Sequence, residues 1–281
     1  MKQNNYYILG IGAILGFSVL FFCSFAPIAK HEKNKLSHLD VNHYNQKQRL
    51  QIEKNIGHTL APVEIDWEDF ASKPAYTCID VSNLSKKQKR KFFTISPISK
   101  EIFSRMKGKS YKKNCSVSKN SLRYVRILHK DLDGNTRIGE LMVHRSIAKK
   151  VKKIFIALYE QDYPIEKMVL IDEYDADDNE SMADNNSSCF NYRKVEGSNK
   201  LSKHSLGLAI DINPRYNPYI HRLHGKTVVS PSNGKEYADR SKSFPYKIDK
   251  KDLAYKLFTK AGFTWGGNWN SVKDYQHFQM D

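Results

Sequence analysis

The sequence has few cysteines, no internal repeats and no low-complexity tracts. Four cysteines occur among 281 residues, and no two of them form a CxxC pair. Paired cysteines at that spacing are typical of zinc-binding and thiol redox motifs, which are therefore excluded here. A chain of this length, with 40% hydrophobic residues, is instead expected to bury one core of catalytic-domain size.

The cysteines leave two interpretations open. Cys23 lies in an apolar N-terminal stretch, so three remain in the rest of the chain: Cys78, Cys115 and Cys189. A Cys78–Cys115 disulfide fits an exported protein. Three buried thiols fit the same sequence equally well.

Acidic residues are also scarce relative to basic ones. The chain has 30 Asp and Glu against 46 Lys and Arg, which gives a formal net charge of +16. Such an excess favours an anionic partner. Nucleic acid, a lipid surface and an acidic cell-wall polymer all satisfy this condition, so charge alone does not choose between them.

The N-terminus separates these alternatives. Residues 6–29 carry no charge and are rich in Ile, Leu and Phe, which predicts a membrane anchor or a signal segment over residues 1–29. Residues 30–60 are polar and predict a linker. We therefore expect an exported protein, anchored or secreted, at the outer face of the cytoplasmic membrane or in the periplasm. Nucleic acid is then excluded as a partner, and we expect a monomer.

Residues 61–281 predict a single α+β domain in which helices flank a small antiparallel sheet. Residues 122–129 and 137–144 alternate as strands and predict a hairpin, and residues 146–162 predict an amphipathic helix that packs on it. A buried strand is expected at 167–172. The polar stretch 173–193 predicts an exposed loop, where a calcium site is conceivable but the EF-hand ligand spacing is missing. Its four acids are Asp175, Asp177, Asp178 and Glu180.

One histidine and one aspartate stand out in the stretch KLSKHSLGLAIDINP. Leu208, Ile210 and Ile212 alternate with polar or small residues, so a strand here sends Asp211 away from the core. A half-buried carboxylate needs a partner. His204 precedes the strand at a bend that Gly207 permits, and an ordinary ion pair explains the two residues as well as a metal site does.

The C-terminal stretch GFTWGGNWNSVKDYQHFQM repeats this combination. Asp274 and His277 lie three residues apart and face the same way on a turn or helix. Two histidines and one carboxylate are the protein ligands of many catalytic zinc sites, in which the fourth position is kept for water. A second carboxylate nearby is suited to act as a general base.

At these residues the chain resembles the zinc-dependent D-Ala-D-Ala carboxypeptidases and dipeptidases and the L-alanyl-D-glutamate endopeptidases of peptidoglycan. The family pattern Ser-x-His-x-x-Gly-x-Ala-x-Asp is filled by residues 202–211, and its acid-x-x-His by residues 274–277. The resemblance covers about residues 75 to 281. It implies zinc held by His204, Asp211 and His277, Asp274 as the catalytic base, and peptidoglycan stem peptides as the substrate.

The resemblance also assigns roles to two further residues. Arg193 resembles the arginine that stabilises the scissile carbonyl as it gains negative charge, although a surface arginine is the alternative. Ser202 either contacts substrate or holds the loop before His204. Many family members carry Glu in place of Asp274, while Asp and the WGGNW element are found in the endopeptidase branch. The positions of Trp265 and Trp269 fit core packing or a groove wall.

The sequence leaves one rival class to the enzyme. A catalytically inactive, membrane-tethered wall-binding module would keep the fold and even the zinc. A complete ligand set together with a base favours the enzyme. His129, His144, His221 and His224 lack a matched carboxylate and are expected outside the site.

Overall fold

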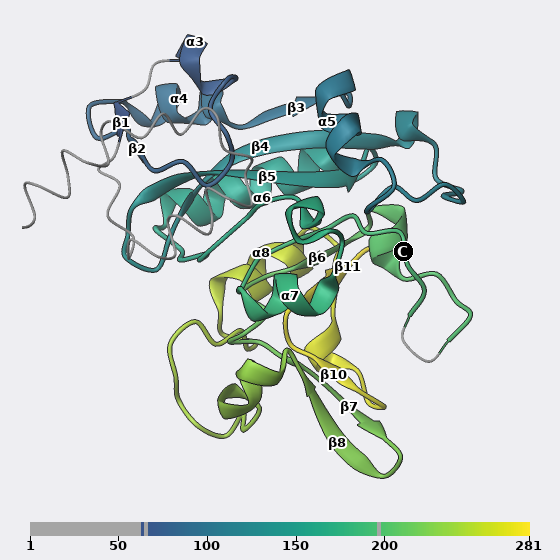
Figure 1. Cartoon of the computed structure of the whole chain (residues 1–281). Helices are drawn as coiled ribbons and strands as arrows, with labels where there is room; N and C mark the ends of the chain where they lie inside the picture. The colour runs from purple at the N-terminus through teal and green to yellow at the C-terminus, as the bar shows by residue number, and fades with distance from the viewer. Residues whose placement is uncertain (1–62, 65–66, 196–197) are drawn as a thin grey trace, which may run out of the picture. The chain divides into compact units, whose positions relative to one another are not determined.

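The computed structural model describes residues 63–64, 67–195 and 198–281. Within these ranges the chain is mixed α and β, with short antiparallel sheets and flanking helices (Figure 1). Buried side chains between Phe70 and Phe278 form one continuous hydrophobic cluster, so elements from both halves of the sequence share a core. This arrangement confirms the predicted α+β class.

The predicted hairpin forms the longest pair of strands. β4 (Leu122–Lys130) and β5 (Thr136–His144) pair antiparallel over their whole length, and β3 (Thr94–Ser96) pairs with the other edge of β4. The Asp131 carboxylate accepts hydrogen bonds from the amides of Asp133 and Asn135, which closes the turn as an Asx turn does.

Helix α6 (Ala148–Glu160) covers this sheet. Its apolar side chains Val151, Phe155 and Leu158 are buried, whereas its lysines point away from the core. The 3.6-residue period of the apolar positions is the reason that one side of this helix packs on the strands, as the sequence predicts.

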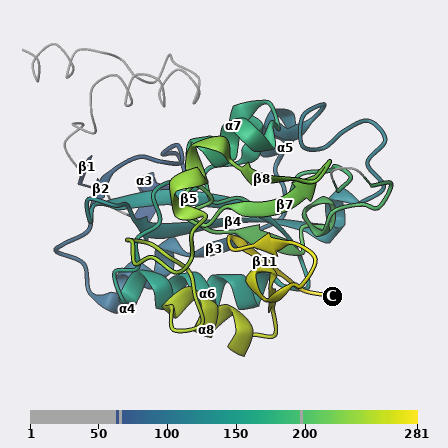
Figure 2. The same ribbon diagram turned by 90° about the horizontal axis from the view of Figure 1, so that it is seen from below.

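A second antiparallel sheet carries both predicted site segments. β11 (His277–Gln279) lies between β6 (Ala209–Asp211) and β9 (Thr264–Trp265). Helix α8 (Leu253–Lys260) packs beside α6 (Figure 2). The Phe258 ring of α8 stacks on the Phe278 ring of β11 at 4.5 Å between centroids. This contact fixes β11, and with it the site, against the core.

A third antiparallel sheet extends from the second. β7 (Tyr219–Leu223) pairs with β8 (Lys226–Ser230) and with β10 (Lys273–Asp274), and the β7–β8 hairpin projects beyond the rest of the fold (Figure 1). Only two residues separate β10 from β11. Asp274 and His277 therefore end one strand and begin the next, rather than sharing a helix.

Short elements complete the described chain. They are β1 (Val63–Glu64), α3 (Trp67–Phe70), β2 (Ile79–Asp80), α4 (Lys86–Lys89), α5 (Lys100–Met106), α7 (Asp178–Ala183), and the 3₁₀ helices η2 (Arg90–Phe92), η3 (Lys119–Ser121), η4 (Ile171–Tyr174), η5 (Lys203–Leu206), η6 (Ser232–Tyr237) and η7 (Gly266–Asn268).

The prediction of a buried strand at residues 167–172 is wrong. Residues 168–171 are buried, but no ladder forms there, because two of their amides donate to side chains and the 3₁₀ helix η4 begins at Ile171. The amide of Val169 donates to Asn186 Oδ1 and that of Leu170 donates to Glu140 Oε1. Buried side-chain acceptors thus replace the strand neighbour that the apolar run suggested.

The prediction of an exposed loop at residues 173–193 is also wrong. This stretch contains helix α7, whose first turn is capped by the Asp177 carboxylate. Several of its polar residues, among them Asn185, Asn186 and Asn191, are buried and hydrogen-bonded. The polar side chains of this stretch therefore make hydrogen bonds inside the protein, whereas the sequence predicted that they face solvent.

Of the two interpretations of the cysteines, the Cys78–Cys115 disulfide is wrong, since Cys115 and Cys189 are free thiols. Cys78 and Cys189 are buried and Cys115 is partly exposed. The predicted anchor or signal segment at 1–29 and the linker at 30–60 lie outside the described residues. Within the described part, no helix is long and apolar enough to cross a membrane.

Candidate metal centre

His204 is held by a short 3₁₀ helix with defined ends. The Ser202 hydroxyl accepts a hydrogen bond from the His204 amide, and Gly207 ends the helix with φ +67°. A Cβ at Gly207 would lie 2.7 Å from the backbone nitrogen of His144. Only glycine combines this left-handed conformation with this close approach, so the bend that the sequence suggested is required to bring His204 over the sheet.

Asp211 and His277 are direct neighbours across β6 and β11. The register pairs Asp211 with His277 and Ile210 with Phe278. Since side chains alternate along a strand, the two apolar residues face the core and the two polar ones share the opposite face. This face carries the candidate metal cluster, in agreement with the predicted position at a sheet face.

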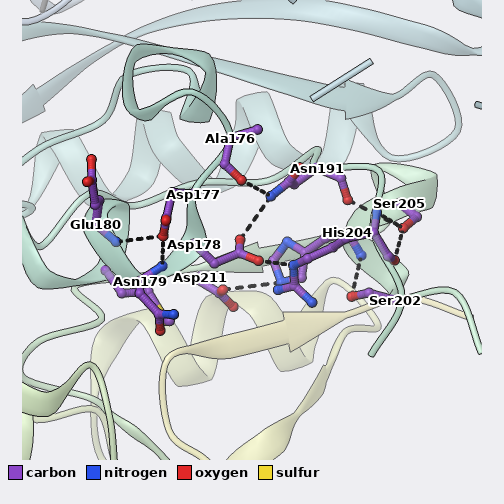
Figure 3. Close-up of polar contacts among 12 residues, drawn as sticks. Ala176, Asp177, Asp178, Asn179, Glu180, Asn191, Ser202, His204, Ser205 and Asp211 are labelled. Carbon is purple, nitrogen blue, oxygen red and sulfur yellow. Dashed lines mark hydrogen bonds and ion pairs between the residues drawn. The ribbon is translucent and has the colours of Figure 1, made fainter. Parts of the chain in front are cut away.

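The three predicted ligands converge on one point. His204 Nε2 lies 3.2 Å from Asp211 Oδ2, and His277 Nδ1 lies 3.0 Å from Asp211 Oδ1. The two imidazole nitrogens, His204 Nε2 and His277 Nδ1, are 3.1 Å apart. All three side chains are buried, and their ligand atoms lie within 4.8 Å of one another. Figure 3 shows the His204 and Asp211 side chains meeting in this way.

Hydrogen bonds on the far side of each ring fix the histidine tautomers. His204 Nδ1 lies 2.5 Å from the carbonyl oxygen of Cys189, which can only accept, so this nitrogen carries the proton. His277 Nε2 lies 3.0 Å from Gln279 Oε1 and likewise donates. The remaining ring nitrogens, His204 Nε2 and His277 Nδ1, thus point at the same position, where a cation can take the place of a proton. Such outer partners are typical of metal-bound histidines.

The electrostatics of the cluster favour a positive charge at that point. Burial lowers the pKa of His277, but the Asp211 carboxylate outweighs burial and raises it to about 9. Burial raises the pKa of Asp211, yet the neighbouring His204 and His277 hold it well below its usual range. Two lone pairs and one carboxylate facing each other match the ligand set of zinc, so the residues present fit this ion.

Asp274 lies beside the cluster without joining it. Its Oδ2 is 3.9 Å from His277 Nδ1, and its buried Oδ1 makes no hydrogen bond in the described structure. Burial raises the pKa of Asp274 to about 7, while His277 lowers it. A carboxyl group with a pKa near neutrality and an unused oxygen is suited to accept and return a proton.

The WGGNW segment positions Asp274, a role that the sequence did not reveal. A Cβ on Gly266 would lie 2.6 Å from the carbonyl oxygen of Asp274 and 2.8 Å from its Cβ. Trp265 is buried and its indole donates to the carbonyl oxygen of Tyr275 at 2.9 Å. Trp269 is partly exposed, with its ring 5.2 Å from that of His277. Core packing therefore describes Trp265, whereas Trp269 borders the site.

Arg193 is held near the cluster by a carboxylate. It forms an ion pair with Asp178 at the start of α7, and the Asn191 side chain donates to the same carboxylate. Its guanidinium also acts to lower the pKa of Asp274, which places the two charges near each other. Ser202 is 6% exposed, and its hydroxyl accepts a hydrogen bond from the His204 amide, which holds the turn before His204.

The acids considered for calcium have separate partners. Asp177 caps α7, Asp178 pairs with Arg193, and Asp175 pairs with Lys109. Across residues 63–64, 67–195 and 198–281, the group that brings three potential ligands together is the His-Asp-His cluster. His129 bonds to the carbonyl oxygen of Ile165 and His144 bonds to Ser146, so both lie outside it. His221 stacks on Tyr219 on β7, and His224 follows at the hairpin tip.

The fold and this cluster define an α+β protein with the donor set of a mononuclear zinc hydrolase. Residues 196–280 match the family model described as D-alanyl-D-alanine carboxypeptidase. The match spans less than a third of the chain and includes the three predicted ligands and Asp274, but not Arg193. It supports a metallopeptidase of peptidoglycan. No curated protein and no solved structure matches the chain.

Proposed function

We propose that this protein is a zinc-dependent peptidase that hydrolyses a peptide bond in peptidoglycan stem peptides. The observation that carries this proposal is the pair of tautomer-fixed histidine lone pairs facing Asp211, with Asp274 beside them. A binding module has no need of a second, half-neutral carboxyl group next to a metal cluster. An enzyme that moves a proton needs one.

Zinc would be held by His204, Asp211 and His277, and would supply a Lewis acid that polarises the carbonyl and lowers the pKa of water. The chain's own residues perform the remaining work. Asp274 accepts the proton of the attacking water at its free Oδ1 and then delivers a proton to the leaving amine. Asp211 has no such role, because both of its oxygens face the histidines.

Arg193 stabilises the negative charge that develops on the scissile carbonyl oxygen. Its ion pair with Asp178 limits the conformations of a long side chain before substrate arrives. A preorganised cation is more effective than one that must reorient during the reaction. The excess of basic residues favours a substrate that bears carboxylates and an anionic wall around it.

The N-terminal segment supports the location of this activity. An apolar stretch at residues 6–29 would export the domain and, if retained, anchor it to the outer face of the membrane, where stem peptides lie. The polar residues 30–60 would give the domain reach toward the wall. On this proposal the protein acts as a monomer on peptidoglycan and has no nucleic-acid partner.

The test is digestion of purified peptidoglycan by the full-length chain, solubilised in mild detergent and loaded with zinc. Fragments are identified by mass spectrometry. We expect either loss of a terminal D-Ala or cleavage between L-Ala and D-Glu, and the fragment masses tell which family branch the chain follows.

The matched control is Asp274→Asn, which is nearly isosteric but cannot accept a proton. It should bind one zinc and lose about 10²- to 10⁴-fold in turnover, the usual contribution of a general base. Wall binding without any fragment from the native protein would instead identify a wall-binding module. Full activity in Asp274→Asn would exclude this residue as the base.

A further inference from the structure

A second concave region lies away from the metal cluster, at the outer face of β4 and β5. Two adjoining cavities of about 560 and 510 Å³ are bordered by α5 and by the segment that follows α3. Both volumes are in the range of small-molecule sites. Both cavities are lined by Ala71, Ile102, Tyr124 and Arg126, so they form one groove, and no residue of the metal cluster lines it.

Arg126 is the charged group at the centre of this groove. Its side chain lies on β4 with 8% of the residue exposed, and its guanidinium carbon is 4.5 Å above the Phe70 ring. Two of its nitrogens donate to the carbonyl oxygens of Ala71 and Lys73, at 2.9 and 2.6 Å. Its Nε has no hydrogen-bond partner. In the described part of the chain no carboxylate pairs with this buried cation.

The other cations that line the groove do have carboxylate partners. Lys73 pairs with Asp69 and Lys109 pairs with Asp175, at 3.1 and 2.8 Å. Arg105 pairs with Glu140 and with Glu173. Among the described cations that line the groove, Arg126 therefore differs from the others in having no carboxylate partner.

Glu140 is the nearest carboxylate in the strand register, since it stands opposite Arg126 across β4 and β5. It does not compensate Arg126 with a hydrogen bond. Both of its oxygens are bonded to Arg105, and they also accept from the Tyr124 hydroxyl and the Leu170 amide. A buried charge that lacks a partner is costly unless a ligand supplies one.

We propose that this groove binds a small organic carboxylate, with its carboxylate on Arg126 and its carbon skeleton against Ile102 and Tyr124. Charge-assisted hydrogen bonds from an arginine to a carboxylate are among the strongest that proteins make. The apolar lining selects an organic acid over a simple inorganic anion, since Ile102, Phe70 and Pro97 offer no hydrogen bonds. This site does not depend on the peptidase activity.

The test uses Ile102, which is half-buried and lines both cavities. Ile102→Glu places a carboxylate inside the groove, where it would take the position of the ligand. Ile102→Gln has nearly the same shape without the charge. Isothermal titration of the full-length protein, in detergent and loaded with zinc, measures binding of glutarate as the probe, with inorganic phosphate titrated in parallel.

We expect Ile102→Glu to lose at least tenfold in glutarate affinity and Ile102→Gln to stay within about threefold of the native protein. Arg126→Gln, checked for folding by its zinc content, should lose glutarate binding as well. Equal glutarate affinity in the native protein, Ile102→Glu and Arg126→Gln would mean that glutarate binds elsewhere, for instance on the zinc, and would overturn the proposal. The same holds if the native protein does not bind glutarate, or if it binds phosphate more tightly.

Discussion

Two buried charged clusters in this molecule differ in how completely their polar groups are hydrogen-bonded. The cluster around Glu140, on β5, includes Arg105, Tyr124 and Glu173, and Glu140 receives hydrogen bonds from Arg105, Tyr124 and the Leu170 amide. The metal cluster on β6 and β11 points two histidine ring nitrogens at one carboxylate, and one Asp274 oxygen has no hydrogen-bond partner.

This difference indicates separate roles for the two clusters: the Glu140 cluster stabilises the fold, and the metal cluster is able to bind an ion. A buried polar network that is fully satisfied stabilises one conformation and leaves none of its polar groups free to bind an ion. A network with unused lone pairs costs stability until an ion or a substrate occupies it. We therefore expect substitutions in the Glu140 cluster to alter the free energy of unfolding, and substitutions in the metal cluster to alter metal binding and turnover.

The largest expected effect is that of His277→Ala. It removes one of three ligands, and three are the minimum for a tight catalytic zinc site, so metal and activity should both be lost. Metal analysis of the purified full-length protein checks this. His144→Ala, which changes a histidine outside the cluster, should keep the zinc. Full zinc retention in His277→Ala would remove this residue from the ligand set.

A smaller effect is expected when the oxyanion cation is removed. Arg193→Ala should lower kcat by about 100-fold, the usual cost of losing one such donor, with zinc content unchanged. Arg222→Ala, at an exposed position on β7, is the matched control and should have native kcat. Steady-state kinetics on a stem-peptide substrate measure this change in kcat. Native turnover in Arg193→Ala would show that this arginine is a surface residue with no part in the reaction.

The Glu140 cluster should give the opposite result. Glu140→Gln leaves Arg105 without its main partner, and breaking a buried ion pair from one side costs about 3 kcal/mol. Chemical denaturation should show this loss, while zinc content and kcat at a permissive temperature stay native. Tyr124→Phe, which removes one donor to the same carboxylate, should cost only about 1 kcal/mol. A loss of zinc in Glu140→Gln would mean that the two clusters are coupled.

The contrast also bears on what the sequence could predict. Alternation and helical periodicity located β4, β5 and α6, because these elements bury one side against a single core. The same logic singled out the predicted ligands Asp211 and His277, since these polar residues interrupt apolar strands. The cluster is thus recognisable in the sequence because it violates the pattern around it.

Features that depend on three-dimensional neighbours were not predictable. Residues 168–170 are apolar enough for a strand, yet Asn186 and Glu140 side chains take the place of a strand partner. Gln279 and the Cys189 carbonyl fix the histidine tautomers, but nothing in their local sequence indicates this role. Gly266 is similar, because its need for glycine arises from the approach of Asp274.

Gly266 offers a finer test of positioning. Gly266→Ala adds a Cβ that would lie 2.6 Å from the Asp274 carbonyl oxygen, so the β10 backbone must shift. We expect kcat to fall roughly tenfold, because small displacements of a catalytic group are costly, while zinc content is kept. Asn268→Ala, at an exposed position in the same loop, should be close to native. Native kcat in Gly266→Ala would show that Asp274 tolerates the shift.

The smallest expected effect concerns His129, a buried titratable group on β4 that belongs to neither cluster. Burial is the main cause that lowers the pKa of its imidazole to about 4, and Arg137 acts in the same direction, against Asp131 and the hydrogen bond to the Ile165 carbonyl. The unfolded chain binds a proton at this histidine near pH 6.5, whereas the folded protein does not until about pH 4. The contribution of His129 to stability is therefore complete above about pH 6.5 and is lost as the pH falls toward 4.

At pH 5.5 the native protein should have lost roughly 1 kcal/mol through this group. His129→Gln, compared by denaturation at pH 7.5 and 5.5, should show a smaller fall in stability than the native protein by that amount, because the carboxylates titrate alike in both. Identical pH dependence in the two proteins would mean that His129 is already protonated, or accessible to water, in the folded state.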